Sequence, residues 1–182
     1  MSDTSYLSST WFHPDLIVKP SSINGQGLFA TEPISVGTTI MVWGGTLYTR
    51  QELADIRAGK LKVAEFSYSF IEEDLLLAAP PDGMDYYVNH SCDPSVWMAD
   101  NVTVAARRDI AKGVEITGDY AVWEADQHYV LPPCTCGSTF CRGTVTGNDW
   151  MRPELQKRYE GHFLPYITRR IERARGNINR SG

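Results

Sequence analysis

Short apolar stretches separated by turn-forming residues dominate the first two thirds of the chain. They are rich in β-branched, aliphatic and aromatic residues, and the stretch at 65–71 alternates apolar and polar positions, which is typical of a strand. Glycine, proline and aspartate lie between them. The pattern predicts a mostly β domain and not a βαβ one. The predicted strands cover residues 16–18, 27–30, 38–43, 65–71, 75–78, 102–106 and 115–117.

Helical signals are fewer and lie mainly near the C-terminal end. Thr49 and Glu52 have the spacing of a capping box, which predicts a short helix that runs to about Gly59. Residues 153–159 begin with a proline in the first turn of a predicted helix. Residues 163–174 are amphipathic, and the arginines on their polar face indicate a solvated surface. The apolar face of this segment carries Leu164, Ile167 and Ile171.

The composition predicts one globular domain. The chain has 182 residues, of which 42% are hydrophobic and 21% are charged. It has neither an apolar run long enough for a membrane span nor the N-terminal pattern of a signal peptide. We therefore expect an intracellular protein, cytoplasmic or nuclear, with reduced thiols. The net charge of −5 argues against a nucleic-acid partner and suits a basic substrate.

The four cysteines predict a metal site. Cys134, Cys136 and Cys141 lie within eight residues of one another, and Cys92 is the remaining cysteine of the chain. Four thiolates can hold one zinc ion in a tetrahedron with no open position, so the metal would be structural. The alternative is four free, buried cysteines. Because the C-terminal three are surrounded by proline and glycine, with little apolar sequence of their own to bury a thiol, we favour the metal.

Three further motifs are ambiguous when each is taken alone. A glycine loop at 22–27 lacks the third glycine and the helix of a dinucleotide fingerprint, so a hairpin turn explains it equally well. Asn89 and His90 suit a polar turn, or His90 could activate Cys92 as a nucleophile, an idea excluded if Cys92 binds metal. A strand that ends in Asp119 and Tyr120 could anchor the core or carry chemistry.

Taken together and in this order, the motifs resemble those of the SET-domain protein lysine methyltransferases. They are GQGLFA at 25–30, NHSCDP at 89–94, GVEITGDY at 113–120, and CTC and CRG at 134–136 and 141–143. The resemblance covers about residues 15–147 and includes the zinc-binding post-SET segment, but there is no cysteine-rich pre-SET segment. It implies a β-clip (SET) fold of several small sheets with a knotted C-terminal segment. The expected division is a flexible N-terminus at 1–14, the SET domain at 15–125, the post-SET segment at 126–147 and a C-terminal helical extension at 148–182.

The resemblance also implies a function and a set of site residues. The expected reaction is methyl transfer from S-adenosylmethionine to the ε-amine of a protein lysine, which leaves S-adenosylhomocysteine. Tyr120 matches the active-site tyrosine of the family, and Tyr68 aligns more loosely with a second tyrosine of the lysine channel. Cys92, Cys134, Cys136 and Cys141 would hold one structural zinc ion. The implied cofactor-binding residues are Asn24, Gly25, Gln26, Gly27, Leu28, Tyr87, Asn89, His90, Tyr120 and Cys136.

The sequence leaves some questions open. Gly118 stands where several histone enzymes have Phe or Tyr, a position linked to the number of methyl groups added, and Met98 or Trp123 could fill the space. An alternative function is therefore a catalytically weak or inactive SET-like module that binds cofactor or peptide. The partner would be a protein or peptide lysine, with histone as one candidate. The C-terminal helices could cap the post-SET segment, or they could form a homodimer through Phe163, Leu164 and Ile167.

Overall fold

The computed structural model describes residues 6–81, 83–131 and 133–178. Within these ranges the strands form one eight-stranded, one three-stranded and one two-stranded sheet, which confirms the mostly β prediction. The first five strands are β1 (Trp11–Phe12), β2 (Leu16–Pro20), β3 (Gln26–Ala30), β4 (Thr39–Val42) and β5 (Thr46–Thr49). The next four are β6 (Ser67–Phe70), β7 (Leu75–Ala79), β8 (Asn89–His90) and β9 (Val96–Met98). The last four are β10 (Thr103–Ala106), β11 (Glu115–Gly118), β12 (Val130–Leu131) and β13 (Val145–Thr146).

The helices are short, apart from the last one. The α-helices are α1 (Arg50–Arg57), α2 (Pro153–Arg158) and α3 (Pro165–Ile178), and the 3₁₀ helices are η1 (Met84–Tyr87), η2 (Tyr120–Val122) and η3 (Asp149–Met151). The predicted capping box begins α1: the Thr49 hydroxyl accepts from the Glu52 N–H at 3.1 Å, and the Glu52 carboxylate accepts from the Thr49 N–H at 2.7 Å. The left-handed backbone of Gly59 follows its end.

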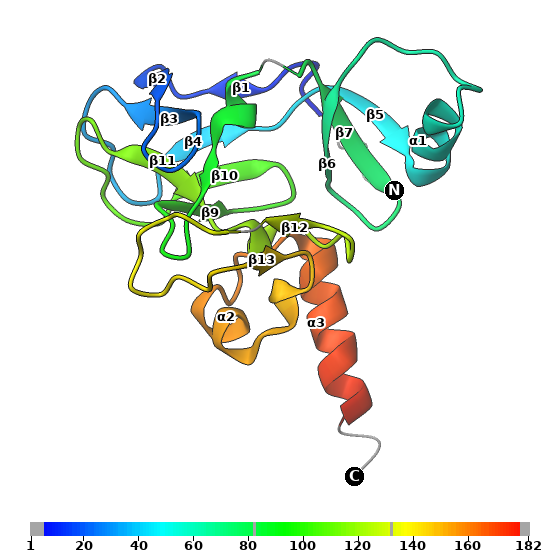
Figure 1. The fold of residues 1–182 in the computed structure, drawn as a ribbon. Helices are drawn as coiled ribbons and strands as arrows, with labels where there is room; N and C mark the ends of the chain where they lie inside the picture. Colours follow the sequence, from blue (N-terminus) through cyan, green and yellow to red (C-terminus); the bar gives the residue numbers. More distant parts are fainter. Residues whose placement is uncertain (1–5, 82, 132, 179–182) are drawn as a thin grey trace.

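The main sheet places four distant segments next to one another. Its order is β1-β4-β10-β9-β11-β3-β2, and β8 also pairs with β11. Here β11 runs parallel to β8 and β9 and antiparallel to β3, so the strand that leads to Tyr120 is central. The three-stranded sheet β5-β7-β6 and α1 form a separate unit beside it, and α2 and α3 lie below (Figure 1). The threading of the segment before Tyr120 under a loop remains a prediction.

The N-terminal segment differs from the expectation. The predicted flexible N-terminus was 1–14, of which residues 1–5 lie outside the described part of the chain. Trp11 and Phe12 pair with β4, and Leu7 forms a bridge with Gly44. Residues 6–14 are therefore docked on the main sheet, because β4 would otherwise leave its backbone groups unpaired at the edge.

The C-terminal extension shares the hydrophobic core of the sheet instead of standing apart. Leu155, Tyr159, Phe163, Leu164 and Ile167 are all nearly inaccessible to solvent and belong to the same cluster as Leu28, Ile116 and Val122. The side chains expected to make a homodimer face are thus buried within the chain, which corrects that expectation for Phe163, Leu164 and Ile167. No described helix is long and apolar enough to cross a membrane.

Candidate active site

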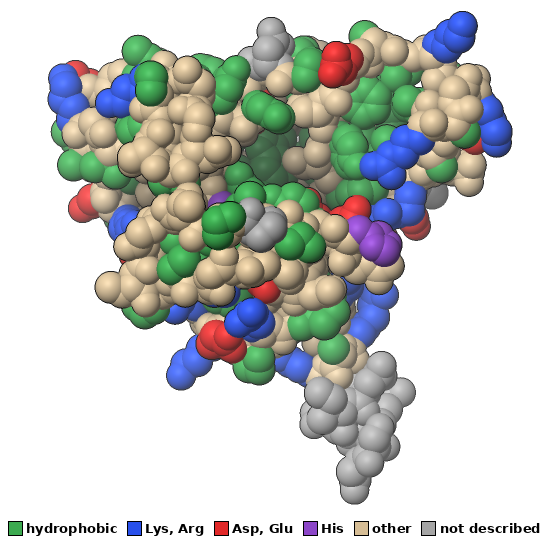
Figure 2. Space-filling model, viewed as in Figure 1, with side chains coloured by type: hydrophobic (Ala, Val, Ile, Leu, Met, Phe, Trp, Pro, Cys, Tyr) green, Lys and Arg blue, Asp and Glu red, His purple; other side chains and the backbone are tan. Residues whose placement is uncertain are grey.

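A cavity of about 310 Å³ opens between the main sheet and the three-stranded sheet. Figure 2 shows it as a recess with hydrophobic side chains between these two units. Both predicted tyrosines, Tyr120 and Tyr68, line this cavity. The aromatic residues around them, which the sequence did not single out for this role apart from Trp123, are Trp43, Tyr86, Trp123 and Tyr129.

Tyr120 begins η2, directly after the central strand β11. Its hydroxyl donates to the Val88 carbonyl at 2.9 Å, and its N–H donates to His90 Nδ1 at 3.2 Å. Burial raises the pKa of the Tyr120 hydroxyl well above its usual value, and the nearby Tyr129 adds to this effect. The residue is therefore a neutral phenol whose proton is directed to the backbone, which leaves the oxygen lone pairs free to accept.

Tyr68 is placed differently from Tyr120. It lies on β6, lines the cavity and has about a third of its surface exposed. Its hydroxyl accepts a hydrogen bond from Arg57 of α1. The structure thus brings Tyr68 and Tyr120 to one cavity, but ties Tyr68 to the three-stranded unit.

Trp123, and not Met98, occupies the space beside Gly118. A Cβ atom built on Gly118 would overlap the six-membered ring of the Trp123 indole. Trp123 also packs near Tyr120, with ring centroids 5.9 Å apart, and meets Trp43 edge-on at 5.9 Å. Met98 is fully buried in the core and does not line the cavity. The Trp123 indole, five residues further along the chain, therefore fills the space that a side chain at position 118 would occupy.

Two carboxylates that the sequence reading missed also line the cavity, Asp85 and Glu124. Burial raises the pKa of both side chains above their ordinary values. Among the described residues that line the cavity, none is basic. Desolvated carboxylates between aromatic walls make the cavity suited to a cation with an apolar stem.

A second group of predicted residues gathers around the glycine loop. The Asn89 side-chain amide donates to the carbonyls of Asn24 and Gln26 at 3.2 and 2.9 Å. It also donates to Glu115 Oε1 at 2.7 Å, and the Ser21 hydroxyl donates to the same carboxylate at 2.9 Å. Glu115, which the sequence did not single out, therefore joins the loop to the central strand. A Cβ atom on Gly27 would overlap this carboxylate, which explains the glycine.

The other predicted cofactor residues lie in different surroundings. Leu28 is fully buried and pairs with strands on both sides, so the structure places it in the core and not at the loop surface. Tyr87 lies in η1, which packs against β3. The cysteine-rich segment reaches the loop directly, because the Thr135 hydroxyl donates to the Ile23 carbonyl at 2.9 Å.

His90 is used within the protein. It is 3% exposed, its Nδ1 accepts from the Tyr120 N–H, and its Nε2 lies 3.2 Å from Cys92 Sγ. Since Nδ1 accepts, Nε2 carries the proton and donates to the sulfur. Burial lowers the pKa of His90 to about 4, so the ring is neutral. Any contact of His90 with a ligand would go through its backbone.

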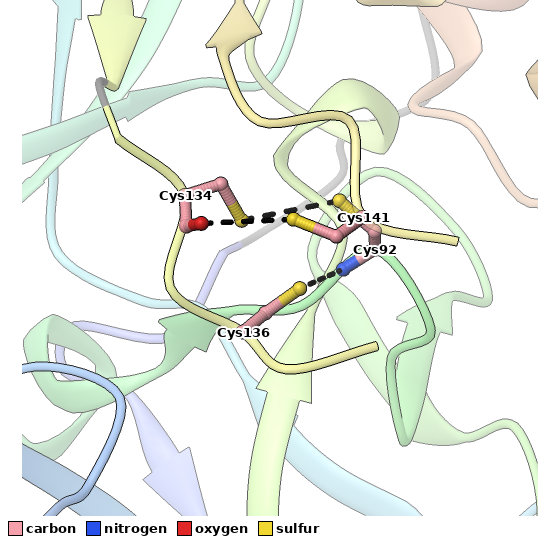
Figure 3. Close-up of side chains that lie close together, drawn as sticks. All are labelled: Cys92, Cys134, Cys136 and Cys141. Atoms are coloured by element: carbon pink, nitrogen blue, oxygen red, sulfur yellow. Dashed lines mark hydrogen bonds between the residues drawn. The ribbon is translucent and has the colours of Figure 1, made fainter. Parts of the chain in front are cut away.

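The four cysteines converge as the sequence predicted. The Sγ atoms of Cys92, Cys134, Cys136 and Cys141 all lie within 4.8 Å of one another, and none forms a disulfide (Figure 3). Tetrahedral zinc with bonds of about 2.3 Å places its sulfurs roughly 3.8 Å apart, so the cluster fits this ion after a small contraction. Backbone N–H groups point at the sulfurs: that of Cys92 at Cys136 Sγ (3.5 Å) and that of Arg142 at Cys92 Sγ (3.4 Å). The cluster is thus compatible with zinc binding.

Comparison with known proteins identifies the family. The model of the SET domain family matches residues 25–121, more than half of the chain, and the chain therefore belongs to this family. It is similar to a histone-lysine N-methyltransferase, H3 lysine-4 specific, of Aspergillus fumigatus, with 31% identity over 137 residues, or 68% of this chain and 11% of that protein. The histone-lysine N-methyltransferase ATX2 of Arabidopsis thaliana is 31% identical over 148 residues, 75% of this chain and 13% of that protein.

A solved structure supports the fold. The methyltransferase domain of human histone-lysine N-methyltransferase SETMAR matches with a TM-score of 0.56 and 20% identity, over 73% of this chain and 57% of that one. The predicted resemblance to the SET domain family and the SET fold are confirmed, and the post-SET segment remains a prediction. The chain spans only 11–13% of the length of the two relatives named above.

Proposed function

We propose that this protein transfers a methyl group from S-adenosylmethionine to the ε-amine of a protein lysine held in the aromatic cavity. The observation that carries the proposal is the cavity itself, in which Tyr120 lies among aromatic side chains and two partly buried carboxylates, and none of the described lining residues is basic. The aromatic walls suit the four methylene groups of a lysine, and the ring faces attract its ammonium group.

The lysine must become neutral before it can act as a nucleophile. Asp85 and Glu124 attract the incoming ammonium and can accept its proton, and burial, which raises the pKa of both carboxyls, makes that proton transfer more favourable. Removal of the amine from water further favours its neutral form. The carboxylates therefore help both the entry and the deprotonation of the substrate.

Tyr120 then orients the amine. Because its proton is donated to the Val88 carbonyl, its oxygen accepts a hydrogen bond from the neutral amine and directs the nitrogen lone pair. S-adenosylmethionine, when bound, supplies the methyl group on a positively charged sulfur. The protein contributes mainly alignment of the two reactants, an effect that can be worth several kcal/mol.

The cofactor site is proposed around the exposed loop at Asn24, Gly25 and Gln26. The loop lies against Asn89 and is contacted by the cysteine-rich segment, so these elements border one surface. Gly27, Tyr87, the backbone of His90, and Cys136 complete the proposed set. Leu28 is left out, because its side chain is in the core.

One structural zinc ion is proposed at the four cysteines. Its role would be to hold the segment around Cys134–Cys141 against Cys92 and the glycine loop. Four free thiols that act as metal ligands suit a reducing, intracellular setting. Histone tails are the first substrates to test, because the similar fungal and plant proteins are named histone-lysine methyltransferases and the chain itself is acidic.

The test is methyl transfer from labelled S-adenosylmethionine to recombinant histones and to a panel of lysine peptides. We expect transfer by the wild type, and a loss of at least a hundredfold in Tyr120→Phe, since the orienting oxygen is removed. Tyr48→Phe is the matched control, because Tyr48 lies on β5 outside the cavity lining. Cofactor binding without transfer to any of these probes would instead favour the non-catalytic module.

A further inference from the structure

Behind Tyr120 lies a buried ionic cluster that the proposed reaction does not use. The Arg142 guanidinium donates two hydrogen bonds to the Asp119 carboxylate, both at 2.7 Å, and one to Asp149 at 2.8 Å. The Tyr159 hydroxyl also donates to Asp119, at 3.0 Å. The side chains of Arg142, Asp119 and Asp149 are 7%, 0% and 3% exposed. Two carboxylates in this cluster face one guanidinium. Arg152, whose Nε lies 3.1 Å from Asp149, supplies the second positive charge.

The cluster joins three parts of the chain: the four-cysteine segment, the start of η2 and the C-terminal extension. Among the described residues, no other set of ion pairs joins these three parts with side chains so deeply buried. Arg142 follows Cys141, and its backbone N–H points at Cys92 Sγ. Asp119 precedes Tyr120, and its Oδ1 accepts from the Ala121 N–H at 3.0 Å, which fixes the start of η2. Asp149 and Tyr159 come from the C-terminal extension, below the sheet in Figure 1.

We infer that Arg142 is a positioning residue for methyl transfer, which couples the four-cysteine segment and the C-terminal extension to the orientation of Tyr120. The inference rests on the proposed function for its catalytic consequence, but the coupling is a property of the chain alone. Asp119 holds the first turn of η2 through its carboxylate, and Arg142 holds that carboxylate with two parallel bonds. Movement of the cysteine-rich segment must therefore move Asp119 or break both bonds.

The chemistry of the cluster supports positioning over simple stabilisation. A buried ion pair adds little stability compared with apolar side chains of the same volume, because both charges must be removed from water. The ion pair instead fixes geometry. The planar guanidinium can donate to two carboxylates in one arrangement, and a lysine cannot reproduce that arrangement. The extension strengthens the same region from outside, since Arg158 donates to the Cys92 carbonyl at 3.0 Å.

The test follows Tyr120 directly in the full-length protein labelled with 3-fluorotyrosine. The resonance of Tyr120, one of nine tyrosines, is assigned from its absence in Tyr120→Phe. We expect Arg142→Lys to shift or broaden this resonance while the bound zinc and the far-ultraviolet circular dichroism stay unchanged. The control is Arg170→Lys, which alters an arginine that contacts Glu73 through two nitrogens but contacts neither Asp119 nor a cysteine.

Kinetics with the histone and peptide probes give the second measurement. We expect kcat to fall by about tenfold to a hundredfold in Arg142→Lys with little change in KM, because misalignment affects the transition state more than binding. If Arg142→Lys does not fold, Asp149→Asn keeps the Asp119 pair and should give the same changes at smaller size. An unchanged Tyr120 resonance in both variants would overturn the coupling. Absence of transfer in the wild type would overturn the proposed function and leave the resonance measurement to decide the coupling.

Discussion

The two sides of the short helix η2 differ in their chemistry, because one is mainly aromatic and the other is held by buried charges. On the cavity side, Tyr120 meets Trp123 and Tyr129 through ring contacts around an open space. On the other side, the neighbouring Asp119 is completely buried and held by hydrogen bonds from Arg142, Tyr159 and Ala121. The comparison indicates that the cavity side, where we propose that the substrate binds, is mainly aromatic, whereas the side that fixes the helix relies on paired charges.

The largest expected effect is on the charged side. Asp119→Ala would leave the buried Arg142 guanidinium without its two-bond partner, which costs about 3–5 kcal/mol in the free energy of unfolding. Tyr120→Phe, one residue away, removes a single hydrogen bond and should cost no more than about 1.5 kcal/mol. Denaturant titration of both variants measures the contrast. Equal losses for the two variants would contradict the division between the two sides.

The second effect concerns the contact between Gly118 and Trp123. Gly118→Ala places a methyl group within the indole, and overpacking of this kind costs about 1–3 kcal/mol. Trp123→Phe provides room, so the double variant should be more stable than Gly118→Ala alone. Thermal unfolding of the two single variants and the double variant completes the cycle. If the two substitutions simply add, the indole does not occupy the space beside Gly118 in solution.

The same contact bears on the number of methyl groups added. A smaller side chain at 123 enlarges the cavity next to Tyr120, so Trp123→Phe should form more highly methylated product than the wild type. Mass spectrometry of a methylated peptide measures the distribution. An unchanged distribution would show that the methylation state is limited elsewhere in the cavity.

The third effect concerns removal of the proposed zinc ion. Chelation should free the segment around Cys136 from Cys92 and weaken binding of S-adenosylhomocysteine by about tenfold or more, since binding must then order that segment again. The main sheet should remain folded, because its core does not depend on the three C-terminal cysteines. Calorimetry and circular dichroism before and after chelation, with zinc added back, test both statements. Unchanged affinity after complete zinc removal would rule out this role.

Much of the fold could be predicted because its signals are local. The capping box of α1, the strands β2, β3, β7 and β11, and the convergence of four cysteines all follow from residue type and short spacing. Strands of two or three residues, such as β1 and β9, carry too little pattern to be predicted. The apolar face of α3 was visible in the sequence, but its partner was not, so a homodimer contact stayed one of two possibilities where the structure shows the core.

The candidate site shows the same limit. Tyr120, Asn89 and the glycine loop were found because motifs mark them. Glu115 was missed because its contact with Asn89 spans 26 residues, and Arg142 was missed because its contact with Asp119 spans 23. Pairings of this length depend on how β11 packs between β8 and β3, which no local pattern states.

The smallest expected effect concerns Glu124, the carboxylate of the cavity side. Burial raises its folded-state pKa above the ordinary value of 4.5, so the folded protein binds this proton more tightly than the unfolded chain. The associated stability is present below pH 4.5 and is lost as the pH rises through the folded-state pKa. Glu124→Gln should remove this pH dependence. The change in the free energy of unfolding should be less than about 1 kcal/mol, because solvent reaches part of the side chain. Unfolding measured against pH tests this, with the exposed Glu154→Gln as control.

The charge of Glu124 should also affect the proposed methyl transfer. Since the charged form of Glu124 attracts the lysine ammonium, Glu124→Gln should raise the KM of a peptide substrate by a few-fold at neutral pH. The difference from the wild type should narrow as the pH falls, because the wild-type carboxyl then becomes neutral as well. A difference that stays constant with pH would mean that Glu124 contributes shape and not charge to the cavity.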